Sequence, residues 1–218
     1  MRCGLFVTGT DTGIGKTVTC AALLCRYRQT VPLRYWKPIQ TGIEQDDDTA
    51  EVRRLASCCD EEIVAEGIRL PHPVSPHLAA RWSGRTITVS DIVESYSVLE
   101  PCIVEGAGGV LVPLNDTEMM IDLMRALALR VLVVARSSLG TINHTLLTLE
   151  ALRARSLWVC GVVMVGTPNP DNRAAVERYG GVPVLGEMPA WKPLEPAAVH
   201  EWATREFDSQ GRLLELLR

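Results

Sequence analysis

The sequence predicts an α/β protein with three layers, in which helices flank a mostly parallel central sheet. Short apolar runs of strand length alternate along the chain with longer segments whose apolar residues recur at helical spacing. Most of the short runs are continuously apolar, as expected for parallel strands that are buried on both faces. A glycine-rich turn joins the first of these runs to the first helix-like segment. Strands are therefore expected at residues 3–9, 33–38, 102–106, 130–135, 159–165 and 182–187.

The segments between these runs supply the expected helices. Residues 16–29 and 143–156 place apolar side chains at helical spacing, and residues 49–56 are also helix-like. Residues 60–90 contain three closely spaced prolines and are expected to form a loop with short helices. The amphipathic C-terminal stretch 200–218 is expected to close the fold as one or two helices.

Length and composition bound the class of protein. The chain has 218 residues, which predicts one domain over residues 1–218. Hydrophobic residues make up 47% and charged residues 22%, as in ordinary globular proteins. The net charge of -4 and the scattered Lys and Arg residues argue against a nucleic-acid partner and favour small molecules.

Compartment is predicted from what the sequence lacks. No apolar run approaches the roughly 20 residues of a membrane helix, and the N-terminus has no signal-peptide pattern. The seven cysteines are odd in number and irregular in spacing, without a zinc-like pattern. We therefore expect a cytoplasmic protein with reduced thiols and no membrane partner.

The glycine-rich stretch VTGTDTGIGKT, residues 7–17, indicates a phosphate site. The strict P-loop pattern G-x-x-x-x-G-K-[ST] would place a glycine at Thr10, but the first glycine, Gly9, lies one residue earlier. In this strand, loop and helix, the backbone N–H groups of the loop and the N-terminal end of the helix can still point at one anion. Lys16 would reach the terminal phosphates and Thr17 would ligate magnesium. The alternative, a glycine-rich turn without a ligand, is disfavoured by this context. Loop and sheet together predict a three-layer P-loop NTPase-like fold.

Carboxylates near the expected crevice are candidate magnesium ligands, because nucleotide-bound Mg2+ commonly takes one or two of them. Glu105 ends the apolar run CIVE, where strand ends of a parallel sheet face the ligand, and the GAGG that follows it is expected to be flexible. Asp46, Asp47 and Asp48 precede the helix-like TAEVRRLA. The alternatives are a surface ion pair for Glu105 and a helix-dipole interaction for the three aspartates.

A second lysine extends the hypothesis from binding to chemistry. Lys37 ends a predicted strand beside Pro38, so its side chain is expected in the same crevice as Lys16. Two cations that flank one phosphate suit phosphoryl transfer. The alternative is an ordinary surface lysine whose ammonium group reaches solvent.

Several motifs together resemble one enzyme family. VTGTDTGIGKT, KPIQTG, an Asp before AEV, SPH, VEGAGG, LGTINHTLLTLEAL and LGEMP occur in this order. They resemble dethiobiotin synthetases from about residue 4 to about residue 189. Many NTPases share the P-loop part, whereas its combination with KPIQTG, VEGAGG and GTINHT is specific. The glycine spacing that departs from the strict P-loop also belongs to this family's pattern.

The resemblance implies an ATP-dependent ligase that joins CO2 or bicarbonate to the diamino acid 7,8-diaminopelargonic acid. A carbamate forms on one amine, ATP phosphorylates it, and the second amine attacks the mixed anhydride and releases phosphate. Lys16 and Lys37 would act as catalytic residues that stabilise the developing charge. The nucleotide would contact Thr12, Gly13, Ile14, Gly15, Lys16, Thr17, Val18, Glu105 and Gly108; Mg2+ would be held by Thr17, Asp48 and Glu105; the substrate would contact Thr12, Lys37 and Thr41.

The resemblance also implies a homodimer. Gly140, Thr141, Ile142 and Asn143 would open a helix whose N–H groups hold the substrate carboxylate. In the family this helix belongs to the other subunit, so the active sites lie at the dimer interface. From the residues alone, Asn143 is an ordinary helix-start residue.

Some positions depart from the family or carry no role. Some members have a glutamate at Gly13, and an asparagine near the nucleotide base where this chain has Val165 or Gly166. ATP is the expected nucleotide, with CTP and GTP left open. His77 in SPH is interpreted as structural, and the adjacent Cys58 and Cys59 as packed or exposed thiols.

Two alternative functions remain. A regulatory ATPase of the partitioning type uses a related fold as a dimerisation switch, but usually carries an extra lysine early in the P-loop, which residues 9–12 lack. Another amide-forming synthetase, such as a cobyrinate-type amidoligase, normally brings a glutaminase domain for which 218 residues leave no room.

Overall fold

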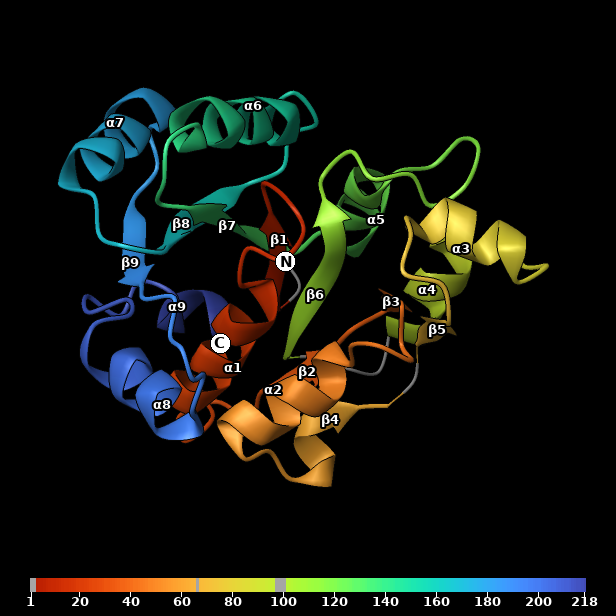
Figure 1. The fold of residues 1–218 in the computed structure, drawn as a ribbon, viewed down its shortest axis with the longest axis horizontal. Coiled ribbons are helices and arrows are strands. Elements are labelled where there is room, and N and C mark those ends of the chain that lie inside the picture. The colour runs from red at the N-terminus through yellow and green to blue at the C-terminus, as the bar shows by residue number, and fades with distance from the viewer. Residues whose placement is uncertain (1–2, 66, 97–100) are drawn as a thin grey trace.

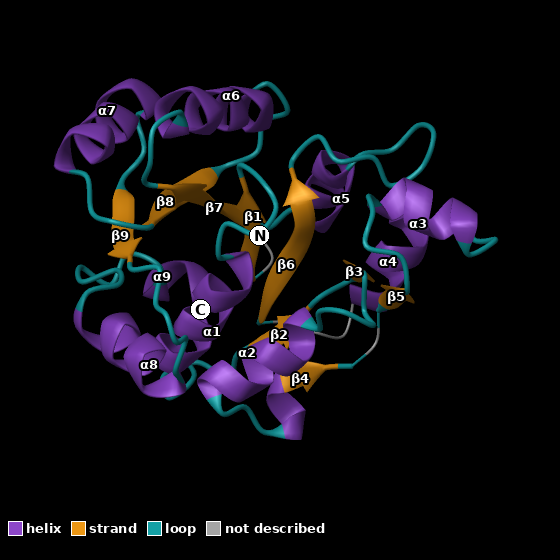
Figure 2. Cartoon of the chain, viewed as in Figure 1, coloured by secondary structure: helices purple, strands orange, loops and turns teal. Residues whose placement is uncertain are grey.

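The computed structural model describes residues 3–65, 67–96 and 101–218, and its centre is a parallel sheet (Figures 1 and 2). The sheet has seven strands in the order β4-β2-β6-β1-β7-β8-β9, and every neighbouring pair runs parallel. The predicted three-layer, mostly parallel fold is therefore confirmed. The strands are β1 (Gly4–Gly9), β2 (Arg34–Trp36), β4 (Ile63–Val64), β6 (Cys102–Gly109), β7 (Arg130–Arg136), β8 (Val159–Val165) and β9 (Val184–Met188).

Helices cover both faces of this sheet, as Figure 1 shows. One face carries α1 (Lys16–Tyr27), α2 (Asp48–Ala56), α8 (Pro196–Arg205) and α9 (Leu214–Leu217). The other face carries α4 (Val89–Tyr96), α5 (Met120–Leu127), α6 (Thr141–Arg153) and α7 (Pro170–Gly180).

Strand β7 shows why the strands are continuously apolar. Val131 and Val133 belong to the core under α4 to α7, whereas Leu132 and Val134 belong to the core under α1 and α8. All four side chains are fully buried. Each such burial is worth about 1.5–3 kcal/mol, so both faces of the strand contribute to stability.

A smaller sheet was not predicted. β3 (Ile39–Thr41) and β5 (Ile68–Leu70) form a separate two-stranded parallel sheet, against which α3 (Pro76–Trp82) packs. The strand expected at 33–38 ends at Trp36, and Pro38, which has no N–H to donate, separates β2 from β3.

The expectation of a loop with short helices at 60–90 was wrong in part. Helices are present, namely a 3-10 turn η1 (Asp60–Glu62), α3 and the start of α4, but the segment also contains β4 and β5. These strands have only two and three residues, too few for a periodic signal. Residue 66 lies outside the described residues.

Three further boundaries differ from the sequence-based expectation. The GAGG after Glu105 was expected to be flexible, but β6 continues through it and Gly109 pairs with Gly9. Helix α6 begins at Thr141, two residues before the start expected from the apolar spacing and within the Gly140 to Asn143 start that the resemblance implied. The C-terminal stretch forms two helices, and the first begins earlier, at Pro196.

A membrane-spanning helix is absent from the described part of the chain. Within residues 3–65, 67–96 and 101–218, no helix combines the length and apolar character needed to cross a bilayer.

Candidate active site

The loop between β1 and α1 is built to hold an anion. Gly13 (φ 68°) and Gly15 (φ 96°) adopt left-handed conformations that favour glycine. A Cβ on Gly15 would also lie 3.0 Å from the Met188 Cε atom. The buried Lys16 returns over the loop, and its Nζ donates to the Asp11 carbonyl at 3.0 Å. The loop amides, the lysine and the N-terminus of α1 therefore surround one small space.

Beside this loop, a lysine and two carboxylates form a buried cluster. Lys37 Nζ lies 2.6 Å from Asp48 Oδ2 and 2.8 Å from Glu105 Oε1. The Thr17 hydroxyl lies 2.8 Å from Asp48 Oδ1 and 3.0 Å from Glu105 Oε1. Lys37 is 3% exposed and Glu105 is 1% exposed, so each charge depends on the others for compensation.

Sheet register explains how distant residues meet here. Strands β2 and β6 are neighbours, with Trp36 opposite Val104, so Lys37 and Glu105 follow side by side. The Arg69 guanidinium donates to the Lys37 carbonyl at 2.8 Å and fixes the backbone where β2 ends. Asp48 enters from α2, whose first turn is capped by the Asp47 side chain.

Electrostatic interactions favour the charged forms of Lys37 and Asp48. Burial alone would lower the pKa of Lys37, but the Glu105 and Asp48 charges outweigh it, and the pKa is raised. For Asp48, burial acts to raise the pKa, whereas Lys37 and Thr17 lower it, and the net shift is downward. Burial, and then the nearby Lys37 charge, lower the pKa of Lys16. The influence of Lys37 on Lys16 reflects the closeness of the two ammonium groups.

Most of the predicted site residues line one cavity of about 220 Å³. Two neighbouring cavities share walls with it: one of about 460 Å³ that Ile14 and Val18 also line, and one of about 480 Å³ beside Thr41. Predicted residues in the wall of the first cavity are Thr12, Gly13, Gly15, Lys16, Thr17, Lys37, Thr41, Asp48, Glu105 and Gly108.

Four predicted substrate contacts lie elsewhere. Gly140, with φ 94°, precedes the first turn of α6, and Thr141 is buried against Thr145. Neither they nor Ile142 and Asn143 line these three cavities. Their expected role in a partner's site is therefore not visible within one chain.

The residues expected to be uninvolved are also outside this cavity. The His77 ring lies 3.0 Å from the Ser75 hydroxyl, and His77 does not line the cavity of about 220 Å³. Cys58 is buried, which raises the pKa of its thiol to about 12, and Cys59 is exposed.

Two residues of the site, Tyr35 and Gln40, were not predicted, whereas Asp46 is one of the three aspartates that the sequence offered as magnesium ligands. Tyr35 donates from its hydroxyl to Glu105 Oε2 at 2.8 Å. Gln40 and Asp46 line the cavity, and the Gln40 amide donates to the Asp46 carbonyl at 2.6 Å. Tyr35 sits two residues before Lys37, so strand alternation could have placed it on the same face.

The donors fit magnesium. Among the described residues, no cluster of three or more His, Cys, Asp or Glu side chains could hold a metal by itself. Two carboxylates and the Thr17 hydroxyl converge instead, which are hard oxygen ligands of the kind that Mg2+ takes together with phosphates and waters. Asp48 is the one of the three adjacent aspartates that reaches this cluster.

The parallel sheet and the loop before α1 define a nucleotide-binding protein of the P-loop NTPase class. Solved structures with this architecture include the septum site-determining protein MinD of Pyrococcus horikoshii complexed with Mg-ADP, at 14% identity and TM-score 0.58, covering 100% of this chain and 95% of that one. A putative plasmid partition protein from Borrelia burgdorferi bound to AMPPNP has 11% identity and TM-score 0.59, covering 99% and 97%. At these identities the likeness concerns the fold.

Sequence relatives define the family more narrowly. A family model described as an AAA domain matches residues 3–198. The ATP-dependent dethiobiotin synthetase BioD of Paramagnetospirillum magneticum is 50% identical over 185 residues, 85% of this chain and 87% of the relative. The BioD of Brucella ovis is 43% identical over 207 residues, 95% of each chain. The chain belongs to the ATP-dependent dethiobiotin synthetase family.

Proposed function

We propose that this protein carboxylates 7,8-diaminopelargonic acid and closes its ureido ring, using CO2 and ATP and releasing dethiobiotin, ADP and phosphate. One observation carries the proposal within this family: Lys16 and Lys37 enter the same cavity from different elements, next to the Thr17, Asp48 and Glu105 oxygens. A phosphate-binding loop needs only the first lysine. A second buried lysine suits a reaction in which two anions are brought together.

The nucleotide triphosphate would lie along the loop from Thr12 to Val18. Backbone N–H groups and Lys16 would bind its phosphates, and Gly108 also lines this cavity. Thr17, Asp48 and Glu105 would hold Mg2+, which when bound supplies positive charge against the phosphate oxygens. The base would enter the cavity lined by Ile14, Val18, Val165 and Trp191.

The walls of that cavity, which would contact the base, are mostly apolar. Val165 stands in its wall; the resemblance places the asparagine of some family members at Val165 or Gly166. Arg136 also lines it, and its guanidinium pairs with the Asp11 carboxylate. ATP is the proposed nucleotide, and comparison of ATP, CTP and GTP as phosphoryl donors would measure the preference.

The diamino acid would occupy the neighbouring cavity of about 480 Å³. Its walls combine the Thr12 and Thr41 side of the site with apolar Pro73, Val74 and Val112. The hydroxyls suit an amine or a carbamate, and the apolar wall suits a hydrocarbon chain. One amine takes up CO2 to give a carbamate, and a carbamate oxygen attacks the γ-phosphorus as ADP leaves.

Ring closure completes the reaction. The second amine attacks the carbonyl carbon of the carbamic-phosphoric anhydride, and phosphate leaves with the oxygen that had joined carbon to phosphorus. Lys37 would lie near this point, where its ammonium group would reduce repulsion between carbamate and γ-phosphate and stabilise charge in the transition state. Lys16 would do the same for the phosphate oxygens.

The complete site is proposed to form in a cytoplasmic homodimer. Gly140 to Asn143 open α6 with N–H groups suited to the substrate carboxylate, yet they line none of the three cavities of their own chain. Leu139 is 97% exposed, and Leu147 on α6 and Tyr179 on α7 are also exposed. Exposed apolar side chains at the start of α6, in its middle and near the end of α7 suit contact with a second copy, which would receive the helix N-terminus.

Phosphate release from Mg-ATP and bicarbonate tests the proposal. We expect release to depend on added 7,8-diaminopelargonic acid. A partitioning-type ATPase would release phosphate whether or not the diamino acid is present. Release that ignores the diamino acid would overturn the proposal.

A further inference from the structure

Tyr35 is a buried residue of β2 with a polar contact inside the site. It is fully buried, and its register partner on β6 is Ile103. Because side chains alternate along a strand, Tyr35 lies on the same sheet face as Lys37, and Ile103 on the same face as Glu105. The tyrosine is therefore two residues farther from the end of β2 than the lysine, and both side chains contact the Glu105 carboxylate.

The two oxygens of Glu105 have different surroundings. Oε1 faces the cavity, where Lys37 donates to it at 2.8 Å and Thr17 at 3.0 Å. Oε2 faces the core, where the Tyr35 hydroxyl donates to it at 2.8 Å. Cys20 lies near the same carboxylate, and burial, followed by the Glu105 charge, raises the pKa of its thiol. Oε2 thus accepts from the Tyr35 hydroxyl, whereas Oε1 accepts from a cation and from the Thr17 hydroxyl.

We infer that Tyr35 is a positioning residue for the magnesium site, because its hydroxyl fixes Glu105 with Oε1 turned toward Thr17 and the cavity. The inference rests on the proposed function, which assigns Glu105 to magnesium. Without the tyrosine hydroxyl, Oε2 of Glu105 would have no hydrogen-bond donor. The carboxylate would then rotate so that both oxygens compete for Lys37 and Thr17, or a water molecule would enter beside Oε2. Outer partners of metal ligands act in this way, by holding ligand orientation rather than by contacting the metal.

A role in stability alone would have a different signature. Tyr27 provides a matched control, because it is also buried and its hydroxyl donates to the Asp208 carboxylate, away from the cavity. Tyr27→Phe and Tyr35→Phe each remove one buried hydroxyl from a carboxylate and keep the ring. Both are expected to lower the melting temperature, and only Tyr35→Phe is expected to change the response to magnesium.

The test uses a fluorescent ADP analogue and the full-length protein. Its affinity is measured in EDTA and then as free Mg2+ is raised, and the Mg2+ concentration that gives half of the affinity increase is compared between variants. We expect Tyr35→Phe to raise this concentration about tenfold. Affinity in EDTA should stay within about twofold of the unsubstituted protein, because outer partners of a metal ligand act through the metal.

Three results would overturn the inference: a magnesium midpoint for Tyr35→Phe within about twofold of the unsubstituted protein, an equal shift in Tyr27→Phe, or nucleotide affinity that does not respond to Mg2+ at all. The assay contains no diamino acid and needs no turnover. A failure of the ligase proposal would therefore appear in phosphate release, and a failure of this inference in the magnesium midpoint.

Discussion

Replacing Lys37 with Met separates catalysis from nucleotide binding, since Met keeps most of the side-chain volume and removes the charge. Lys37 Nζ contacts the Asp48 and Glu105 carboxylates at 2.6 and 2.8 Å and the Gly106 carbonyl at 3.3 Å. Removal of one partner from a buried ion pair typically costs about 3–5 kcal/mol of the free energy of unfolding. We expect the lower end, because the Asp48 side chain is 22% exposed and can turn to water.

The catalytic effect of this substitution should be larger than its effect on binding. Loss of one preorganised donor to a developing charge lowers kcat about 10²–10³-fold. The ADP dissociation constant should change little, because we propose that Lys16 and the loop amides bind the phosphates.

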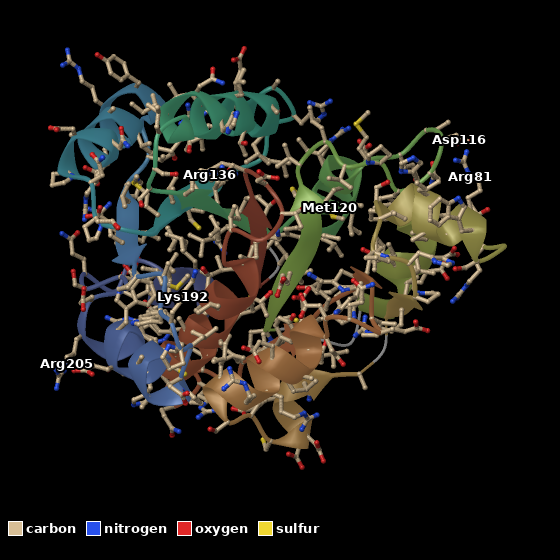
Figure 3. All side chains as sticks on the ribbon, in the orientation of Figure 1. Arg81, Asp116, Met120, Arg136, Lys192 and Arg205 are labelled. Carbon is tan, nitrogen blue, oxygen red and sulfur yellow. The ribbon has the colours of Figure 1, made fainter. Side chains whose placement is uncertain are left out.

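Single-turnover phosphate release and equilibrium binding of the fluorescent ADP analogue measure the two effects of Lys37→Met. Lys192→Met is the control, since Lys192 is exposed on the loop before α8 and is labelled in Figure 3. A Lys37→Met protein that is folded and keeps kcat within about tenfold of the unsubstituted protein would refute the role we give this lysine in stabilising charge.

The remaining predictions concern magnesium and the dimer. Glu105→Gln should raise the Mg2+ requirement and lower turnover together, and an unchanged magnesium titration would exclude Glu105 from the metal site. Asp48→Asn should have the same effect, whereas Asp46→Asn should leave the magnesium titration unchanged. The reverse result would show that Asp46, and not Asp48, is the magnesium ligand. Asn143→Asp should repel the substrate carboxylate, yet an equal mixture with Lys37→Met subunits should recover about a quarter of full activity through mixed dimers with one intact site. A mixture no more active than its components would contradict a shared site.

The sequence predicted the long elements well, and it placed candidate site residues at the ends of several of them. Continuous apolar runs identified β1, β6, β7 and β8, because burial on both faces leaves an unambiguous pattern. The neighbourhood of Lys37 and Glu105 followed from their positions at strand ends, although their ion pair depends on the register between β2 and β6, which only the structure supplies.

The parts that the sequence did not predict depend on short or long-range contacts. β3 and β5 have three residues each and exist because they pair with each other across the chain. In the sequence, Tyr35 has the pattern of any core aromatic residue in a strand. Its role depends on the hydrogen bond from its hydroxyl to Glu105, which lies 70 residues away in the chain. The GAGG stretch has the composition of a flexible loop, but pairing with β1 makes it strand.

Oxygen transfer from bicarbonate to phosphate tests the central claim most directly. The protein would be mixed rapidly with ATP, 7,8-diaminopelargonic acid and 18O-labelled bicarbonate in unlabelled water, and the released phosphate analysed by mass spectrometry. A carbamate oxygen that attacks the γ-phosphorus leaves with the phosphate, so the account predicts one 18O atom in each phosphate formed before the label exchanges with water. Phosphate without 18O would mean that water attacks ATP, and the proposed carbamic-phosphoric anhydride would be contradicted.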